Sequence, residues 1–210
     1  ALVAPYQPGN YIGYWNLRNS QGKYFGLGPN GETPITLQVV VLEGGALVSY
    51  DFASNYCAAE WRSRAGLLPC LGFDNEENGF VVFLEYPQLE NGPDIGPALW
   101  MHPYNSNGGW ISGSYPAIQI RRGDRFRAKV GCQIENPDCD VIFQVEYELM
   151  NGNVQTLGQW RETYDGRVTS INLDLSPLAG QYVKFVFTLT AQNNLPEDAN
   201  GVWVYPRIGQ

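Results

Sequence analysis

The sequence predicts an all-β protein, a single jelly-roll β-sandwich of about eleven strands with local disulfides. Short segments with alternating apolar residues recur along the chain, and turn-forming residues separate them. Val, Thr, Tyr and Phe, which strands favour, are plentiful, and no segment keeps a helical period with capping signals. Gly (24) and Pro (14) are frequent, as many turns require.

The strands are expected in a regular order along the chain. Residues 35–42 and 46–52 flank Glu43-Gly44-Gly45 and predict a tight hairpin. Residues 80–86, FVVFLEY, are apolar on both faces, which predicts a central strand. The remaining strands are predicted over residues 98–104, 117–120, 124–134, 139–149, 154–164, 168–175, 182–191 and 202–208.

Residues 180–191, GQYVKFVFTLTA, alternate most clearly. Their apolar residues share one parity, so this strand buries one face. Trp160 and Trp203 lie in other predicted strands and are expected in the core. The core positions of the strand are Val183, Phe185, Phe187, Leu189 and Ala191.

The start of the chain differs in composition from the rest. Residues 1–30 are rich in Gly, Pro, Asn and Tyr and predict neither a good strand nor a helix. We expect an extended N-terminal segment over residues 1–30 and one jelly-roll sandwich over residues 31–210. An extended apolar segment can add a strand to the sheet of a neighbouring copy. The residues expected to make this contact are Ala1, Leu2, Val3, Ala4 and Tyr6.

The four cysteines predict disulfides. Their spacing favours the local pairs Cys57–Cys70 and Cys132–Cys139 among the three possible pairings. The rival is a zinc site, but the chain has no C-x-x-C and a single His, so no metal centre is expected. The first bridge would clamp an insertion over residues 55–79, with a short helix around residues 58–64. Disulfides indicate an extracellular or cell-surface protein.

Strand parity also predicts how the second bridge is built. Residues 124–134 and 139–149 are expected to form a hairpin with Cys132 opposite Cys139. The expected pairs are then Val130 with Val141, Ala128 with Phe143, Phe126 with Val145, Arg127 with Gln144, and Arg125 with Glu146. In this register Arg125 and Arg127 lie on a solvated strand face, and acidic residues of the next strand can offset their positive charge.

Charge and hydropathy exclude several partners. A net charge of −8 and a pI near 4.6 argue against nucleic acid, since no basic patch is present to neutralise phosphates. No apolar run approaches the ~20 residues of a membrane-spanning helix. The chain begins at Ala1 without an initiator Met or signal peptide, as a processed secreted protein would.

Catalytic motifs are missing from the sequence. The single His, His102, has no evident nucleophile, G-x-S-x-G does not occur, and no two acids stand out as a hydrolytic pair. We therefore expect a protein that is not an enzyme and needs no cofactor. Residues 73–79 (FDNEENG) and 194–201 (NLPEDANG) could supply oxygen ligands to a structural calcium ion, although neither matches an EF-hand loop.

The second half of the chain carries a resemblance. The run ALWMHP…GGWISGSYPAI…GDRFRAKVGC…CDVIFQVEYEL…GVWVYPRI, over residues 98–208, resembles carbohydrate-binding-module jelly rolls of the NPCBM kind in secreted bacterial proteins. The turn Leu178-Ala179-Gly180 before a strand and Trp203 in the last strand match that pattern, with Glu197 and Asp198 as a loose match to its acidic loop. The resemblance implies a jelly-roll fold and, less firmly, a sugar ligand.

Two functions from different classes follow. The first is a structural subunit of an extracellular filament or surface layer, in which copies join through the N-terminal segment. The alternative is a carbohydrate-binding module that stacks sugars on loop aromatics, and core packing of these aromatics is the competing explanation. The residues of the predicted sugar site are Trp100, His102, Tyr104, Trp110 and Tyr115.

Overall fold

The computed structural model describes residues 9–41, 48–70, 72–73, 77–192 and 196–210. The chain divides into two compact units, Ala1–Leu47 and Val48–Gln210. The division predicted after residue 30 differs from this one, because β4 (Ile35–Val41) pairs, within the residues described, only with a strand of the first unit. Each unit is described separately below.

The first unit contains two strand pairs. β1 (Gly9–Trp15) and β4 (Ile35–Val41) form an antiparallel ribbon, with Gly9 opposite Val41 and Trp15 opposite Ile35. β2 (Leu17–Arg18) pairs with β3 (Tyr24–Phe25) in the connection between them. A strand thus occupies residues 9–15, where the composition predicted only a poor one.

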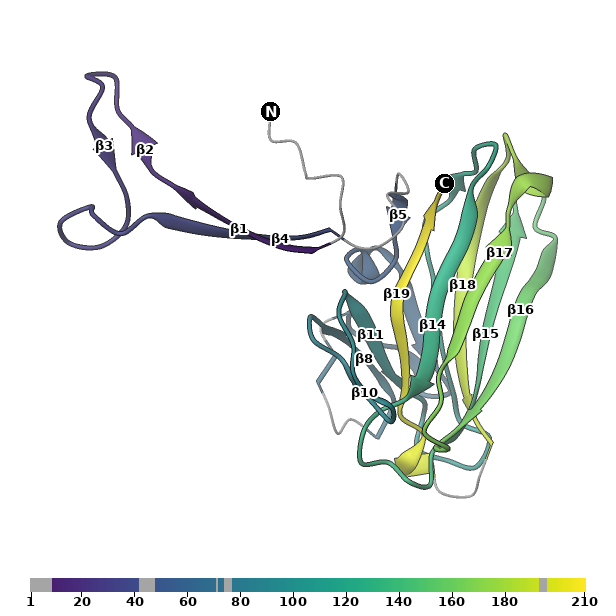
Figure 1. The fold of residues 1–210 in the computed structure, drawn as a ribbon. Coiled ribbons are helices and arrows are strands. Elements are labelled where there is room, and N and C mark those ends of the chain that lie inside the picture. Colours follow the sequence, from purple (N-terminus) through teal and green to yellow (C-terminus); the bar gives the residue numbers. More distant parts are fainter. Residues whose placement is uncertain (1–8, 42–47, 71, 74–76, 193–195) are drawn as a thin grey trace. The chain divides into compact units, whose positions relative to one another are not determined.

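The second unit is a sandwich of two antiparallel sheets packed face to face (Figure 1). The first sheet has the order β17-β14-β19-β11-β8, with β5 also paired to β19. Its strands are β5 (Val48–Asp51), β8 (Phe80–Leu84), β11 (Ala98–His102), β14 (Arg125–Cys132), β17 (Thr169–Asp174) and β19 (Gly201–Gly209). The predicted all-β sandwich is confirmed.

The second sheet has the order β16-β15-β18-β12-β6-β7, with β13 also paired to β18. Its strands are β6 (Glu60–Ser63), β7 (Gly66–Leu67), β12 (Trp110–Ser114), β13 (Ile118–Gln119), β15 (Asp140–Leu149), β16 (Val154–Thr163) and β18 (Tyr182–Ala191). The small pair β9 (Gln88–Leu89) and β10 (Gly92–Pro93) and the 3-10 turns η1 (Tyr56–Ala58), η2 (Ser176–Leu178) and η3 (Pro196–Asp198) complete the unit. Among the described residues, no helix is long and apolar enough to cross a membrane.

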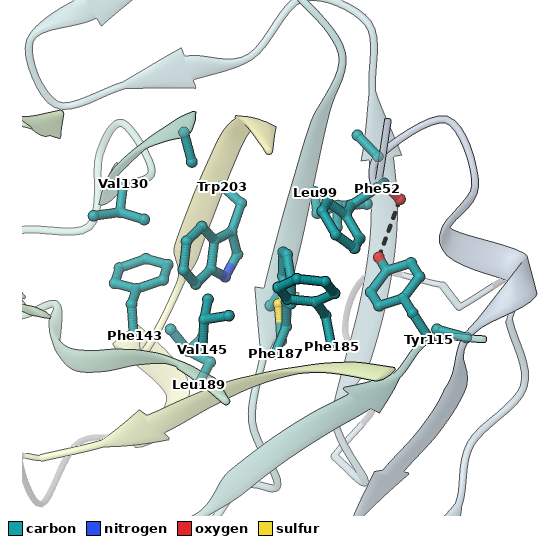
Figure 2. Close-up of a cluster of buried hydrophobic side chains, with 14 of the residues drawn as sticks. Phe52, Leu99, Tyr115, Val130, Phe143, Val145, Phe185, Phe187, Leu189 and Trp203 are labelled. Atoms are coloured by element: carbon teal, nitrogen blue, oxygen red, sulfur yellow. Dashed lines mark hydrogen bonds between the residues drawn. The ribbon is translucent and has the colours of Figure 1, made fainter. Parts of the chain in front are cut away.

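The core lies between the two sheets and is rich in aromatic rings (Figure 2). The alternation in β18 is confirmed, since Val183, Phe185, Phe187 and Leu189 have no exposed surface. Trp203 of β19 is also fully buried, and its ring lies 4.9 Å from that of Phe187. Trp160 is partly buried against the same cluster, as expected.

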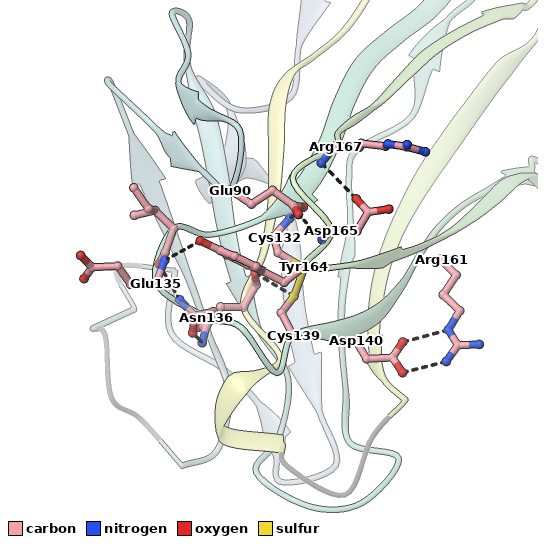
Figure 3. The surroundings of a disulfide bond; sticks show 12 residues. Glu90, Cys132, Glu135, Asn136, Cys139, Asp140, Arg161, Tyr164, Asp165 and Arg167 are labelled. Atoms are coloured by element: carbon pink, nitrogen blue, oxygen red, sulfur yellow. Dashed lines mark hydrogen bonds and ion pairs between the residues drawn. A yellow bond between two sulfur atoms is a disulfide. The ribbon is translucent and has the colours of Figure 1, made fainter.

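Both predicted disulfides are present, but the predicted hairpin between Cys132 and Cys139 is wrong. β14 pairs with β17 and β19, whereas β15 pairs with β16 and β18, so the bridge links the two sheets (Figure 3). The parity argument holds nonetheless, because both strands bury the residues expected. Two strands with matching apolar faces can stand side by side in one sheet or face each other across a core, and this chain takes the second arrangement.

Other local predictions are also wrong. The hairpin 35–42/46–52 does not form, since β4 pairs with β1 and β5 with β19, and Glu43-Gly44-Gly45 lie outside the described residues. β8 is an edge strand of its sheet. In place of a helix around residues 58–64, η1 is followed by β6, where Trp61 and Ser63 are buried between exposed neighbours.

Candidate ligand-binding pocket

A polar pocket opens on the outer face of the first sheet, at one end of β8 and β11. Leu99 and Met101 of β11 point into the core and are fully buried. Trp100 and His102 alternate with them and therefore project from the opposite face. Phe80 of β8 is directly opposite His102 in the antiparallel register, so all three rings share that face.

The three rings pack against one another. The rings of Phe80 and His102 are nearly parallel, with centroids 5.2 Å apart and an interplanar angle of 15°. The ring of Trp100 meets Phe80 edge to face, with centroids 4.9 Å apart. Such contacts hold large side chains in fixed orientations, so the pocket has a rigid aromatic side.

The side-chain amide of Asn200, just before β19, joins the elements around the pocket. Its Oδ1 accepts a hydrogen bond from Trp100 Nε1 at 2.9 Å and lies 3.2 Å from His102 Nδ1. Its Nδ2 donates to Asn136 Oδ1 at 2.7 Å and to the carbonyl oxygen of Glu197 at 3.1 Å. Both hydrogens and the oxygen of this 8% exposed amide are thus used.

This network defines the tautomer of His102. An indole nitrogen only donates, so the amide atom that faces Trp100 is the oxygen. Nδ1 of His102 faces the same oxygen and must carry the imidazole proton, which makes Nε2 the acceptor of the neutral ring. Burial lowers the pKa of His102, and the hydrogen bond to Asn200 and the charge of Glu197 oppose that effect only in part. The ring is therefore neutral at pH 7.

The pocket has a volume of about 250 Å³. Acidic and amide side chains face its aromatic side. Its lining residues are Glu77, Phe80, Trp100, His102, Asn105, Glu197 and Asn200. Two carboxylates and the Nε2 atom of a neutral imidazole are all acceptors, so the pocket is chemically suited to a ligand rich in hydroxyl donors.

The structure divides the predicted sugar-site residues. Trp100 and His102 line the pocket, and Tyr104 and Trp110 do not. Trp110 lies in β12, a strand of the other sheet. Tyr115 was expected among the loop aromatics, but it is 1% exposed and packs in the core, where its hydroxyl donates to the carbonyl of Phe52 at 3.0 Å (Figure 2). An apolar core position with one hydrogen-bond partner accounts fully for Tyr115.

Five lining residues were absent from the predicted sugar site: Glu77, Phe80, Asn105, Glu197 and Asn200. Glu77 and Glu197 lie in the two acidic segments that suggested calcium ligands, and the fold brings both to one pocket. No local spacing identifies Asn200, because its partners Trp100 and Asn136 are 100 and 64 positions away.

Other predicted sites concern metal and assembly. Among the described residues, no group of three or more His, Cys, Asp or Glu could hold a metal ion. The acidic segments 73–79 and 194–201 fall partly outside those residues, so a structural calcium ion stays a prediction. The proposed assembly residues, Ala1 to Ala4 and Tyr6, lie outside the described residues as well.

The fold and the pocket define a disulfide-bearing β-sandwich with a polar, aromatic-lined recess at one end. No protein-family model matches the sequence, and a search of curated proteins returns no match. The solved structures that resemble this chain include several carbohydrate-binding modules.

Three of these structures illustrate the likeness. A carbohydrate-binding module of the β-sandwich superfamily is 11% identical, with a TM-score of 0.47 over 96% of this chain and 74% of the other. CBM51-2 and INT domains of Clostridium perfringens ZmpB, in complex with GlcNAc, are 10% identical, with a TM-score of 0.48 over 99% of this chain and 39% of the other. A CBM61 module in complex with β-1,4-galactotriose is 8% identical, with a TM-score of 0.47 over 77% and 97%.

Proposed function

We propose that this chain is a secreted, non-enzymatic carbohydrate-binding protein that holds a neutral sugar in the pocket beside Trp100. The single observation that carries the proposal is the composition of that pocket. Sugars bind by laying an apolar ring face on an aromatic side chain while acceptors take their hydroxyl hydrogens. Trp100 supplies the aromatic surface, with the buried ring of Phe80 packed against it, and Glu77, Glu197 and Nε2 of His102 supply acceptors.

Charge limits the class of sugar. Glu77 and Glu197 both line the pocket, and the protein carries a net charge of −8. A carboxylate or sulfate in this pocket would face two like charges, without a compensating cation among the lining residues that the structure describes. The ligand proposed is therefore an uncharged saccharide. The two formed disulfides support a protein that works outside the cytoplasm.

Binding of neutral mono- and disaccharides, measured by isothermal titration calorimetry, tests the proposal. Trp100→Ala removes the aromatic surface and is expected to weaken binding by about tenfold, the upper range of the value of one aromatic contact. Trp110→Ala is the matched control, since Trp110 is half-buried on the other sheet and is not part of the pocket. Equal loss in both variants, or none in Trp100→Ala, contradicts the proposal.

A second candidate function, association between copies in a filament or surface layer, is favoured by the β1–β4 ribbon. One face of this ribbon carries Tyr11, Trp15, Ile35, Leu37, Val39 and Val41, with Gly13. Trp15 is 45% and Leu37 40% exposed, and no charged residue occurs in either strand. Within the described residues, β1 and β4 pair only with each other, so each keeps an open edge. Exposed apolar faces and unprotected strand edges are typical of surfaces that bind another chain.

Size-exclusion chromatography with light scattering, together with negative-stain images, tests this second function. The variant Trp15→Ser/Leu37→Ser is expected to reduce assemblies to monomers. Tyr86→Ser, at another residue that is 61% exposed, is the control. Deletion of residues 1–8 separates the two modes, because it leaves ribbon contacts intact and abolishes strand donation by the N-terminal segment. A wild-type protein that is monomeric at every concentration contradicts both modes.

A further inference from the structure

Two arginines face each other on the outer surface of the first sheet. Arg127 of β14 and Arg207 of β19 are directly opposite in the antiparallel register. Their neighbours Phe126, Ala128 and Ile208 are buried in the core, so both guanidinium groups project outward. Like charges directly opposite in adjacent strands repel each other, and Asp51 of β5, opposite Arg207 on its other side, offsets part of this repulsion.

The acidic partners expected for this row of arginines are in the other sheet. Glu146, the acid expected opposite Arg125, belongs to β15, which pairs with β16 and β18 and not with β14. Among the described residues, neither Arg127 nor Arg207 forms an ion pair with a carboxylate. The structure therefore places Arg127 opposite a second arginine, where the predicted register placed the neutral Gln144.

Within the described part of the chain, each of these arginines donates one side-chain hydrogen bond. Nη1 of Arg127 donates to the carbonyl of Gly209, and Nη1 of Arg207 donates to the carbonyl of Tyr205, both at 3.1 Å. A guanidinium has five N–H donors in a planar fork, which matches the oxygens of a carboxylate or sulfate. These single backbone bonds orient the two groups and leave the other donors for a ligand.

Other charged groups lie near this pair. Nε of Arg125 donates to Asn172 Oδ1 at 2.6 Å, and Lys129 is paired with Asp94 at 2.6 Å. Asp51 of β5 lies opposite Arg207 on the side away from β14. Its two carboxylate oxygens accept hydrogen bonds from the backbone N–H and the hydroxyl of Ser54. The space between β14 and β19 is therefore the more positive side of Arg207.

Backbone geometry at Tyr205 supports a functional role for this place. The register between β14 and β19 shifts between Arg127 and Lys129, so β19 has a bulge at Tyr205 and the residue after it. Tyr205 has a φ of 46°, in the left-handed region that side chains other than Gly avoid. Its ring lies 4.1 Å from the guanidinium carbon of Arg207 and supports that group from one side. Bulges re-aim side chains, and such strained residues concentrate at binding sites.

We propose that Arg127 and Arg207 bind the carboxylate of an acidic saccharide such as a uronic acid. One acid group between two guanidinium forks would relieve their repulsion. Two arginines on an otherwise acidic protein suit a single acid group better than the continuous phosphates of a nucleic acid. Only the saccharide part of the ligand rests on the proposed function, because the anion is recognised by the arginines alone.

Calorimetric titration with trigalacturonate tests the site, and its fully methyl-esterified form is the neutral control ligand. The acid form is expected to bind and the ester to bind at least tenfold more weakly. Arg127→Gln and Arg207→Gln should each weaken binding of the acid form about tenfold, the value of one lost hydrogen bond to a charged group. Arg161→Gln is the matched control, since it removes the same charge from β16, where Arg161 pairs with Asp140. Arg207→Lys keeps the charge, loses the fork and should weaken binding severalfold.

Further measurements distinguish this anion site from the neutral-sugar pocket and from other modes of binding. Trp100→Ala should leave trigalacturonate binding unchanged while it weakens neutral sugars, so the two proposals can fail independently. Inorganic sulfate should compete with trigalacturonate if the anion alone is recognised. The proposal is overturned if wild type and Arg207→Gln, both folded by circular dichroism, bind the acid form equally. It is also overturned if the ester binds as well as the acid, or if an oligonucleotide binds more tightly than trigalacturonate.

Discussion

The indole nitrogen of Trp100 donates to the side-chain oxygen of Asn200 at 2.9 Å, across a separation of 100 residues. Trp100 belongs to β11, and Asn200 lies just before β19, the strand next to it. One amide thus fixes the aromatic side of the pocket and, through Asn136, the loop between β14 and β15. The pocket is built around this contact, so its stability and its binding should respond together when the contact is lost.

Replacement of Asn200 by Ala tests that dependence. The variant leaves the indole N–H of Trp100 and the Nδ1–H of His102 without their acceptor in a largely buried site. We expect the free energy of unfolding to fall by about 2 kcal/mol, measured by chemical denaturation, and binding of neutral sugars to be lost. Asn105→Ala, at an exposed residue of the same pocket, should leave stability unchanged. An equal stability of Asn200→Ala and wild type would refute the structural role of the amide.

The protonation of His102 can be followed directly, because the chain contains one His. Burial lowers the pKa of its imidazole from the ordinary value of 6.5. The unfolded chain then binds its proton at a higher pH than the folded one, so stability falls as pH drops through 6.5 toward the folded pKa. An NMR titration of the ring should give a midpoint below 6.5 for the folded protein and near 6.5 in denaturant. If the titration midpoint of His102 in the folded protein is at or above its midpoint in denaturant, the expected lowering of the pKa is contradicted.

Sequence parity predicted which faces of the strands are buried, but not how the strands are distributed between sheets. Phe126 and Val130 of β14, and Val141 and Phe143 of β15, are all buried as expected. Alternation reports only which side of a strand meets apolar surroundings, and that side is the same in a hairpin and across a sandwich. The connection between Cys132 and Cys139 allows both arrangements, and long-range pairing with β19 and β18 decides between them.

The sequence also predicted only part of the pocket. Trp100 and His102 could be singled out because aromatics and amides cluster near them in the sequence. Asn200 and Phe80 could not, since their roles depend on pairing between distant strands. Tyr115 was misplaced for the opposite reason, because a buried aromatic near a loop has the same sequence signature as an exposed one.

Glu162 of β16 carries a second pH dependence, of opposite sign. Its side chain is 6% exposed, and burial raises its pKa to about 7, with a smaller opposing effect from the hydrogen bond to Thr169 and further increases from Glu90 and Asp165. The folded protein therefore holds this proton more tightly than the unfolded chain. Its contribution to stability is present below pH 4.5 and is lost as pH rises through about 7.

Glu162→Gln removes the buried charge. We expect the variant to be more stable than wild type by about 2 kcal/mol at pH 8, with the difference vanishing near pH 4. Melting temperatures across this pH range measure the effect. Glu148→Gln on β15, where the carboxylate is paired with Lys184, is the control and should show no such rise. A constant difference between Glu162→Gln and wild type at all pH values would rule out the titration of Glu162 as its cause.

Loss of either disulfide should lower stability, but only loss of Cys132–Cys139 should also weaken sugar binding. Each closes a short loop, so the loss of either is expected to cost about 2.5 kcal/mol of unfolding free energy. Cys132–Cys139 links the two sheets beside Asn200, whose carbonyl oxygen lies 3.7 Å from the sulfur of Cys139. Cys132→Ser/Cys139→Ser should therefore also weaken sugar binding, whereas Cys57→Ser/Cys70→Ser should not. Equal effects of the two double variants on binding, measured by calorimetry well below their melting temperatures, would contradict this assignment.

The opposition of Arg127 and Arg207 makes a prediction about stability that is independent of any ligand. Arg127→Gln removes one of two like charges that stand directly opposite, and glutamine can still donate to the carbonyl of Gly209. Relief of this repulsion should stabilise the protein by about 0.5 kcal/mol, or a rise of ~1–2 °C in melting temperature. Because salt screens the repulsion, the gain should shrink at 1 M NaCl, where the Debye length is about 3 Å. Arg161→Gln is the control, because it loses a favourable pair with Asp140 and should show no gain in melting temperature. If Arg127→Gln melts below wild type at low salt, the two arginines do not repel each other.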